Sequence, residues 1–310
     1  MATTRTPPAP KGPPPAPAVQ HLLVTYAKRG RMRFASHRDV GRAFERAVRQ
    51  AGVPIARSAG FSPHPKISYA SGTQTGVASE AEYLTLALTA AQDPARLGAA
   101  LDRGLPDGID VIEVREDSGG ALNGRLTASE WLMELPGISS DAATAAVRQF
   151  LAAAAAPVER LTSKGVRRLD ARGVVLTMDV SLRAFTGYSG ECAIIRMVVR
   201  HSEPAVRPED VLTALRQIAG LVPASAPAVT RVAQGVVGDG GLAGPVGQPV
   251  GQAALSPTAE HKDVPRGRPC APWAADPCCP AARWSAFPRG GPAALRLRGM
   301  RGFSRGPAQN

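Results

Sequence analysis

Acidic residues are almost absent from the first 70 residues of this 310-residue chain, and aromatic residues make up only 5% of it. Its four cysteines are too few for a disulfide-rich scaffold. No apolar run reaches the ~18 residues that a membrane-spanning helix needs. The first 19 residues lack the apolar stretch of a secretory signal. These absences predict a protein of the reducing cytoplasm with no membrane partner.

Proline and glycine are concentrated at the two ends of the chain. Residues 1–18 hold seven prolines, which predicts a disordered or polyproline arm. Residues 237–310 hold 12 glycines and 11 prolines, which predicts a disordered tail. In this tail His261, Cys270, Cys278 and Cys279 do not have the spacing of a zinc site, so neither metal nor cofactor is predicted. The segment 19–236 remains as the part that can fold.

Within that segment, strand-like and helix-like apolar patterns alternate. In the first half they predict strands at 21–26, 67–69, 83–88 and 109–115, with 31–34 continuing the first strand, and helices at 36–51 and 94–102. In the second half they predict strands at 131–135, 174–182, 193–199 and 228–233, and helices at 141–155 and 208–218. Both halves follow the order β-α-β-β-α-β. The sequence therefore predicts an α+β fold of two tandem ferredoxin-like subdomains, 19–125 and 126–236.

Positive charge is concentrated in one block. The whole chain has a formal net charge of +12, and residues 21–70 carry ten Lys and Arg against two acids. On the first predicted helix, four arginines recur about once per turn, opposite an apolar stripe: Arg38, Arg42, Arg46 and Arg49. Such a row suits successive phosphates, because each guanidinium is always charged and can bind in bidentate fashion. The alternative is an ordinary solvated helix face.

Two neighbouring segments extend this block. Ser36 and His37 stand at the helix N-terminus, which favours anions, and the alternative for His37 is a structural hydrogen bond. The loop 58–66 combines Gly60, Phe61, His64 and Lys66, and an aromatic ring beside cations suits a base stacked next to its phosphate. Alternatively Phe61 fills the core. The predicted nucleic-acid-binding residues are Arg31, Arg33, Ser36, His37, Arg38, Arg42, Arg46, Arg49, Gly60, Phe61, His64, Lys66, Arg168 and Arg172.

Arg168 and Arg172 form a second cluster around Asp170, which is either an ion-pair ladder or part of an anion groove. Glu80 and Glu82 are expected to pair with arginines. His37, His64 and Lys66 are the candidate catalytic residues, since two imidazoles and an ammonium can move protons and neutralise a phosphorane-like transition state. That chemistry requires the three side chains to converge.

The sequence resembles the radical-SAM-linked bacterial family, a domain of unknown function. The resemblance rests on KRGRMRFASHRD at 28–39, FERA at 44–47, GFSPHPKIS at 60–68 and residues 76–83. It implies an association with radical S-adenosylmethionine chemistry, on RNA, and it supplies no catalytic residue. The chain lacks the clustered cysteines of an iron–sulfur site, so that cluster is expected in a partner.

Three functions remain open at this point. The leading one is a cytoplasmic accessory that binds RNA or presents a substrate, with no small-molecule ligand assigned. The second is a metal-independent enzyme that cleaves or modifies RNA. The third is a module that docks onto a radical-SAM or RNA-acting partner enzyme through its acidic surface.

Overall fold

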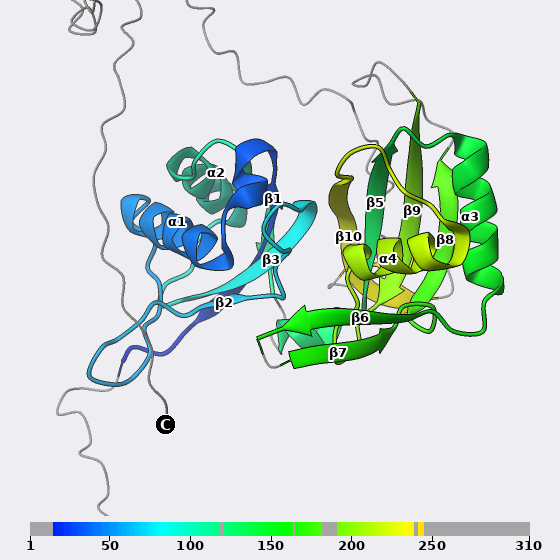
Figure 1. The fold of residues 1–310 in the computed structure, drawn as a ribbon. Helices are drawn as coiled ribbons and strands as arrows, with labels where there is room; N and C mark the ends of the chain where they lie inside the picture. The colour runs from blue at the N-terminus through cyan, green and yellow to red at the C-terminus, as the bar shows by residue number, and fades with distance from the viewer. Residues whose placement is uncertain (1–14, 118–120, 164, 182–190, 239–240, 245–310) are drawn as a thin grey trace, which may run out of the picture. The chain divides into compact units, whose positions relative to one another are not determined.

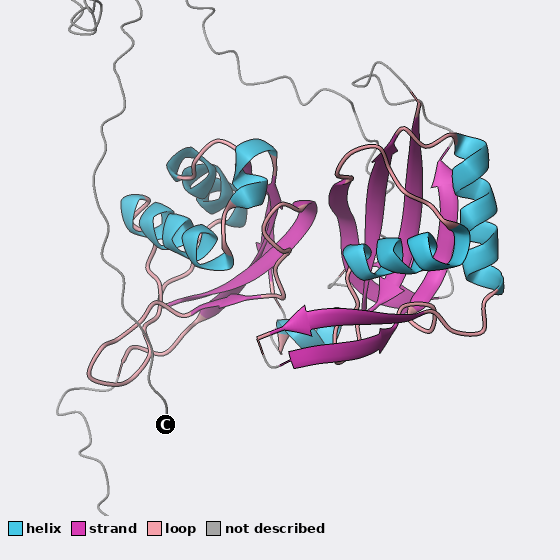
Figure 2. Ribbon diagram, in the orientation of Figure 1, coloured by secondary structure: helices cyan, strands magenta, loops and turns pink. Residues whose placement is uncertain are grey.

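The computed structural model describes residues 15–117, 121–163, 165–181, 191–238 and 241–244. This part of the chain has a mixed α+β fold in which four α-helices pack against one large mixed sheet (Figures 1 and 2). Most of the predicted arm and tail, including His261 and the three tail cysteines, lies outside the described residues. No helix in the described ranges is both long and apolar enough to cross a membrane.

The first half places two helices on one face of its strands (Figure 1). Its elements are β1 (Gln20–Lys28), η1 (Gly30–Phe34), α1 (His37–Gln50), β2 (Ile67–Tyr69), β3 (Ala78–Leu88), α2 (Pro94–Gly104) and β4 (Ile109–Glu116). β1 lies between β4 and β3, and β2 pairs with the far edge of β3. Because β1 is covered on both faces, its residues from Leu22 onward are buried.

Helix α1 forms for reasons that are visible in its sequence. Val40, Phe44, Ala47 and Val48 are buried on one stripe, against strands β1 and β3. Ser36 begins the helix with a capping box: its hydroxyl accepts from the Asp39 N–H, and the Asp39 carboxylate accepts from the Ser36 N–H, each at 3.3 Å. The predicted cap and apolar stripe are both confirmed.

The second half repeats this arrangement with an added hairpin. Its elements are η2 (Leu122–Arg125), β5 (Ala128–Pro136), α3 (Ser140–Ala152), β6 (Pro157–Thr162), β7 (Gly165–Asp170), β8 (Val175–Ser181), β9 (Cys192–Arg200), α4 (Pro208–Ala219), β10 (Ala228–Gly238) and β11 (Gly241–Ala243). Strands run in the order β10-β5-β9-β8, and β6 pairs only with β7. Phe150, Met133 and Ile195 are fully buried in its core.

Strand β10 joins the two halves into one sheet. It lies antiparallel to β5 and pairs in parallel with β3 at two positions, Thr230 with Ala78 and Arg231 with Ser79. The buried Gln234 amide also donates to the Ala81 carbonyl on β3, at 2.6 Å. The strand order across the joined sheet is β4-β1-β3-β10-β5-β9-β8.

Three segments differ from the sequence prediction. The segment predicted to continue the first strand is the 3₁₀ helix η1, because Gly30 turns the chain with φ +50°. The β6–β7 hairpin was not predicted, since its strands are largely exposed and lack a clear apolar alternation. The last strand passes the predicted boundary at 236, because β10 continues to Gly238 and pairs with β11.

The α1 cap leads to a stability prediction. Replacing Ser36 by Ala removes the hydroxyl that accepts from Asp39, and we expect the free energy of unfolding to fall by about 1 kcal/mol. The Ser36 hydroxyl and N–H hold the pKa of Asp39 below its ordinary value. The ionised cap therefore contributes its full stability above about pH 4, and this is lost as the pH falls through the folded pKa. Urea denaturation at pH 7 and pH 3 measures the difference, which should shrink at the lower pH; an equal difference at both values contradicts the capping account.

Candidate nucleic-acid interface

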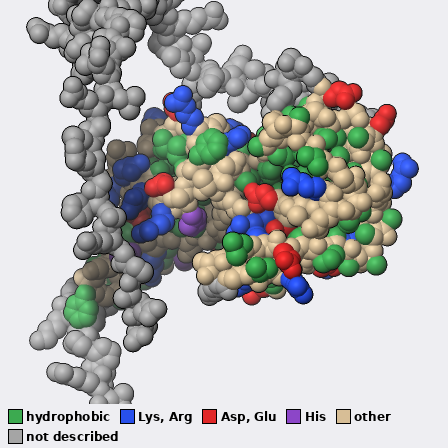
Figure 3. All heavy atoms as spheres, viewed as in Figure 1, with side chains coloured by type: hydrophobic (Ala, Val, Ile, Leu, Met, Phe, Trp, Pro, Cys, Tyr) green, Lys and Arg blue, Asp and Glu red, His purple; other side chains and the backbone are tan. Residues whose placement is uncertain are grey.

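The four arginines of α1 face solvent. Arg38, Arg42, Arg46 and Arg49 are all exposed. Among the described carboxylates only Asp39 comes within reach of this row, at 4.0 Å from Arg42 across one helical turn. Figure 3 shows Lys and Arg side chains gathered over α1 on the visible face. The helix therefore presents a row of cations that internal ion pairs leave almost uncompensated.

Two other cations of the basic block serve the fold instead. Lys28 is 3% exposed, and its ammonium donates to the Gln74 carbonyl at 3.2 Å. Burial lowers its pKa. Arg29 bridges Glu80 and Asp110. Counting charge along the sequence therefore overestimates the charge available to a ligand.

The segment between these residues and α1 is only partly open. Arg31 is exposed, whereas Arg33 is half-buried with its guanidinium 4.8 Å from the centre of the Phe34 ring. At the helix N-terminus, Ser36 and Asp39 already supply the acceptors that an anion would replace. The structure shows a self-capped helix end here, and an anion site at Ser36 and His37 stays a prediction.

The loop 58–66 is closed at its base and open at its tip. The Ser58 N–H donates to the His64 carbonyl at 2.9 Å, and the His64 N–H donates to the Ser58 hydroxyl at 3.0 Å. Between them Gly60 adopts φ +130°. The Phe61 side chain is 74% exposed, so it does not fill the core. His64 and Lys66 are exposed as well, which leaves an aromatic ring and cations on one projecting loop.

The structure places two of the three catalytic candidates, His37 and Lys66, on different faces of the sheet. Lys66 pairs with Ala56 and Ala87 in an extended conformation that leads into β2. Ile67 and Tyr69 pack on the face of the sheet that α1 covers, so the alternating position Lys66 points to the opposite face. His37 lies on α1, with its ring centre 5.3 Å from that of Tyr69. This placement does not favour direct cooperation of His37 with Lys66, and a catalytic role of His37, His64 and Lys66 stays a prediction.

The second basic cluster is used within the fold. Arg168 on β7 pairs with Glu159 on β6 at 2.9 Å, which favours the ion-pair interpretation. Arg172 donates to the carbonyls of Leu151 and Val175 at 3.2 and 3.1 Å. Asp170 accepts from the backbone N–H groups of Ala156 and Arg172. Arg172 therefore has structural contacts within the fold, and its contact with a nucleic acid stays a prediction.

The two glutamates pair with arginines, as expected, but not with those of α1. Glu80 pairs with Arg29, and Glu82 pairs with Arg231 on β10 at 2.6 Å. Glu82 and Arg231 are each 4% exposed at the side chain. This buried ion pair crosses the β3–β10 junction, and the sequence analysis did not identify Arg231.

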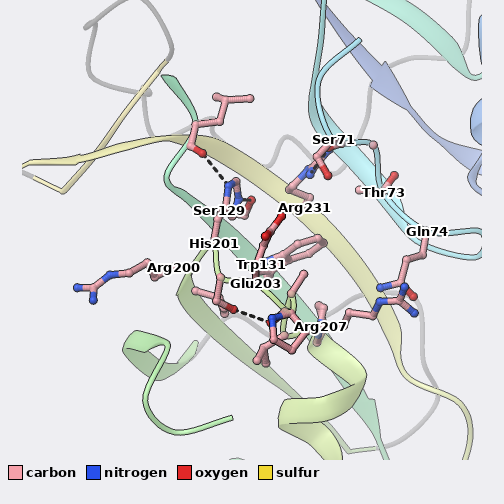
Figure 4. Close-up of a pocket in the computed structure, with 18 of the residues that line it drawn as sticks. Ser71, Thr73, Gln74, Ser129, Trp131, Arg200, His201, Glu203, Arg207 and Arg231 are labelled. Carbon is pink, nitrogen blue, oxygen red and sulfur yellow. Dashed lines mark hydrogen bonds between the residues drawn. The ribbon is translucent and has the colours of Figure 1, made fainter. Parts of the chain in front are cut away.

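A second site that the sequence analysis missed is a cleft of about 1040 Å³ between the loop 71–74 and the second half (Figure 4). Its lining includes Ser129, Trp131 and His201, together with five arginines: Arg160, Arg167, Arg200, Arg207 and Arg231. The lining residues come from segments as far apart as 71–74 and Arg231. No local sequence pattern includes all of these residues, because only the tertiary structure brings them together.

His201 is held in one orientation at this cleft. Its Nδ1 lies 2.8 Å from the Leu126 carbonyl, and its Nε2 lies 2.7 Å from the Ser129 hydroxyl. Because a carbonyl only accepts, Nδ1 carries the proton and the Ser129 hydroxyl donates to Nε2. Burial lowers the pKa of His201, and the nearby Arg231 adds to this effect. Ser129 is 1% exposed, so it positions the imidazole rather than acting as a nucleophile.

No group of three or more His, Cys, Asp or Glu residues with the geometry of a metal site occurs in the described part of the chain. The tail residues His261, Cys270, Cys278 and Cys279 lie outside the described residues.

Comparisons with known proteins identify a family without assigning a function. The family model described as "Uncharacterized protein conserved in bacteria (DUF2344)" matches residues 21–208. No curated protein matches the sequence. Among solved structures, one described as an unknown protein from Galdieria sulphuraria is 17% identical, with a TM-score of 0.20. The match covers 69% of this chain and 99% of that one.

Proposed function

The chain belongs to the DUF2344 family of uncharacterized bacterial proteins, and we propose that it acts as an RNA-binding accessory through the exposed face of α1. The observation that carries this proposal is the row of Arg38, Arg42, Arg46 and Arg49, exposed and with one long ion pair among them. A row of guanidiniums without internal partners binds a polyanion at little desolvation cost.

Phe61 favours RNA over an acidic protein as the polyanion. Its ring is 74% exposed on the loop 58–66, where His64 and Lys66 are exposed too. An exposed ring beside cations offers a stacking surface for an unpaired base while the cations contact phosphate. Acidic protein surfaces supply carboxylates for the cations but no base to stack on the ring.

We further propose that each half is a ferredoxin-like unit and that the protein presents RNA to a radical-SAM partner in the cytoplasm. Supporting the first point, each half orders its strands alike, β4-β1-β3-β2 in one and β10-β5-β9-β8 in the other. The resemblance carried by residues 28–39, 44–47, 60–68 and 76–83 supports the second point. In this arrangement the partner supplies the chemistry and this chain supplies the RNA surface.

Titration of the full-length protein with labelled transfer-RNA and ribosomal-RNA fragments across a salt series tests the RNA-binding proposal. Each phosphate contact on a single strand contributes about −0.7 to the slope of log affinity against log salt, so four arginines predict a slope of about −3. A slope near zero contradicts the proposal. An RNA affinity no greater than the affinity for heparin contradicts the proposal as well, and would favour the docking module instead. Retention of a protein partner after nuclease treatment would then be the next measurement.

Phe61 supplies a separate prediction. Because Phe61 is largely exposed, replacing it by Ala should leave the free energy of unfolding within about 0.5 kcal/mol of wild type. RNA affinity should fall by about 1–3 kcal/mol, which is about 5- to 150-fold, if one base stacks on the ring. Leu161→Ala is the matched control, because Leu161 is 80% exposed on the β6–β7 hairpin. Equal losses in the two variants would show that Phe61 has no special contact with RNA.

A further inference from the structure

The cleft beside Trp131 carries positive charge that the fold leaves uncompensated. Arg160 on β6 and Arg167 on β7 are directly opposite each other in the hairpin register, and both line the cleft. Like charges in opposed positions repel. Arg160 is neutralised by Asp210 at 2.7 Å, whereas Arg167 has no carboxylate within 4.0 Å among the described residues. An anion in the cleft would compensate the charge of Arg167.

A further guanidinium comes from the segment that leads into α4. Arg160 donates to both Asp210 and the Ala205 carbonyl, which ties the hairpin to this segment. The Arg207 N–H donates to the same oxygen of Asp210, at 2.8 Å, while its guanidinium has no ion-pair partner among the described residues. Asp210 thus binds both Arg160 and Arg207 and neutralises the first, while Arg167 lies opposite Arg160 in the hairpin. Glu203 is the one acid among the residues that line the cleft.

The cleft wall also offers groups suited to a flat ring. Trp131 is half-buried there, with the Arg231 guanidinium 5.6 Å from the centre of its ring. His201 keeps a fixed orientation through Ser129 and the Leu126 carbonyl. The Thr73 hydroxyl is buried without a hydrogen-bond partner on the facing loop. Figure 4 shows His201, Trp131 and Arg207 near one another, whereas the Arg200 side chain points away from them.

We propose that this cleft binds a nucleoside phosphate, with the phosphate held by Arg167 and Arg207 and the base beside Trp131. Guanidinium forks match phosphate oxygens, and an aromatic ring with a few fixed polar groups suits a base. The volume of about 1040 Å³ admits a mononucleotide and its bound water. The site is separate from the α1 face, so the proposal goes beyond RNA binding there and does not depend on it.

Isothermal titration of the full-length protein tests the cleft. The probes are AMP, GMP, CMP and UMP, with inorganic phosphate and adenosine as half-ligands. We expect at least one mononucleotide to bind below about 1 mM and at least about tenfold more tightly than either half-ligand. Arg167→Gln and Arg207→Gln should each weaken that binding about tenfold. Thermal denaturation of each variant verifies that it is folded before it is titrated.

The chain offers matched controls for both variants. Arg168→Gln changes the neighbouring arginine of the same hairpin, which pairs with Glu159 instead of lining the cleft. Arg148→Gln changes an exposed arginine on α3 that is not among the residues lining the cleft. Both should retain affinity within about twofold. No mononucleotide binding at 1 mM, or equal losses in the controls, overturns the proposal.

The two proposals can fail separately. A protein with Arg42, Arg46 and Arg49 reversed to Glu keeps its cleft intact, so it should bind the mononucleotide as wild type does. If this variant loses mononucleotide binding, then the nucleotide occupies the α1 face and the cleft proposal is wrong. If wild type binds mononucleotide but no RNA, then the RNA proposal is wrong and the cleft proposal is supported.

Discussion

Replacing Arg231 by Met should lower the free energy of unfolding by about 3–5 kcal/mol. The guanidinium pairs with Glu82 at 2.6 Å, with both side chains 4% exposed. It also donates to the Ser71 carbonyl at 3.2 Å. Methionine fills much of the same volume, but it leaves the buried Glu82 carboxylate without its ion-pair partner, with only the electrostatic attraction of Lys28 remaining among the described cations. An uncompensated buried charge costs far more than the net contribution of the intact pair.

The position of this pair makes the effect global. Arg231 lies at one of the two positions where β10 pairs with β3, so it helps to join the two halves of the sheet. Urea denaturation followed by far-ultraviolet circular dichroism measures the loss. Wild-type and variant proteins should unfold with similar denaturant slopes if the junction opens together with the rest.

A second substitution distinguishes the loss of the ion-pair attraction from the cost of leaving the Glu82 carboxylate buried without its partner. Adding Glu82→Gln to Arg231→Met removes the uncompensated carboxylate, and the double variant should recover more than half of the loss. Arg168→Met breaks the exposed pair with Glu159 and should cost less than about 1 kcal/mol. A double variant no more stable than Arg231→Met alone would contradict the buried-charge account.

The elements that the sequence predicts well are those with a strong local signal. Helix α1 has an apolar stripe, a capping box and a Gly52 stop, and its bounds of 37–50 lie close to the predicted 36–51. The segment 31–34 is predicted as a strand because its apolar and basic residues alternate. Its observed conformation, however, depends on contacts with distant residues. The Arg33 carbonyl there accepts from the Gly76 N–H at 2.8 Å.

The candidate sites are harder to predict, because they depend on pairings between distant residues. Charge counting places Lys28 and Arg29 with the α1 row, yet the partners of Arg29 lie 51 and 81 residues downstream. The same limit hides the cleft, where Arg160 and Arg167 become neighbours only through the hairpin and Arg207 joins them through Asp210. By contrast, the α1 row is predictable because helical periodicity alone places its members on one face.

Reversing Arg42, Arg46 and Arg49 to Glu should lower RNA affinity by at least about 100-fold at 0.1 M salt. The triple variant removes three cations from the proposed contact surface and adds three anions that repel phosphate. All three side chains are exposed, so the core of α1 is untouched. Stability should fall by no more than about 1 kcal/mol, through the long Arg42–Asp39 pair and the favourable charge of Arg49 in the last turn.

A matched control distinguishes RNA binding by the α1 surface from a response to the net charge of the whole protein. Reversing Arg96, Arg103 and Arg148 to Glu makes the same change in net charge at exposed positions on α2 and α3. This control should lose less than about tenfold in RNA affinity, because long-range attraction is largely screened at 0.1 M salt. Equal losses in the two triple variants would mean that RNA responds to total charge and that α1 is not a binding face. A loss confined to the α1 variant, with a shallower salt slope, would assign the released counterions to that row.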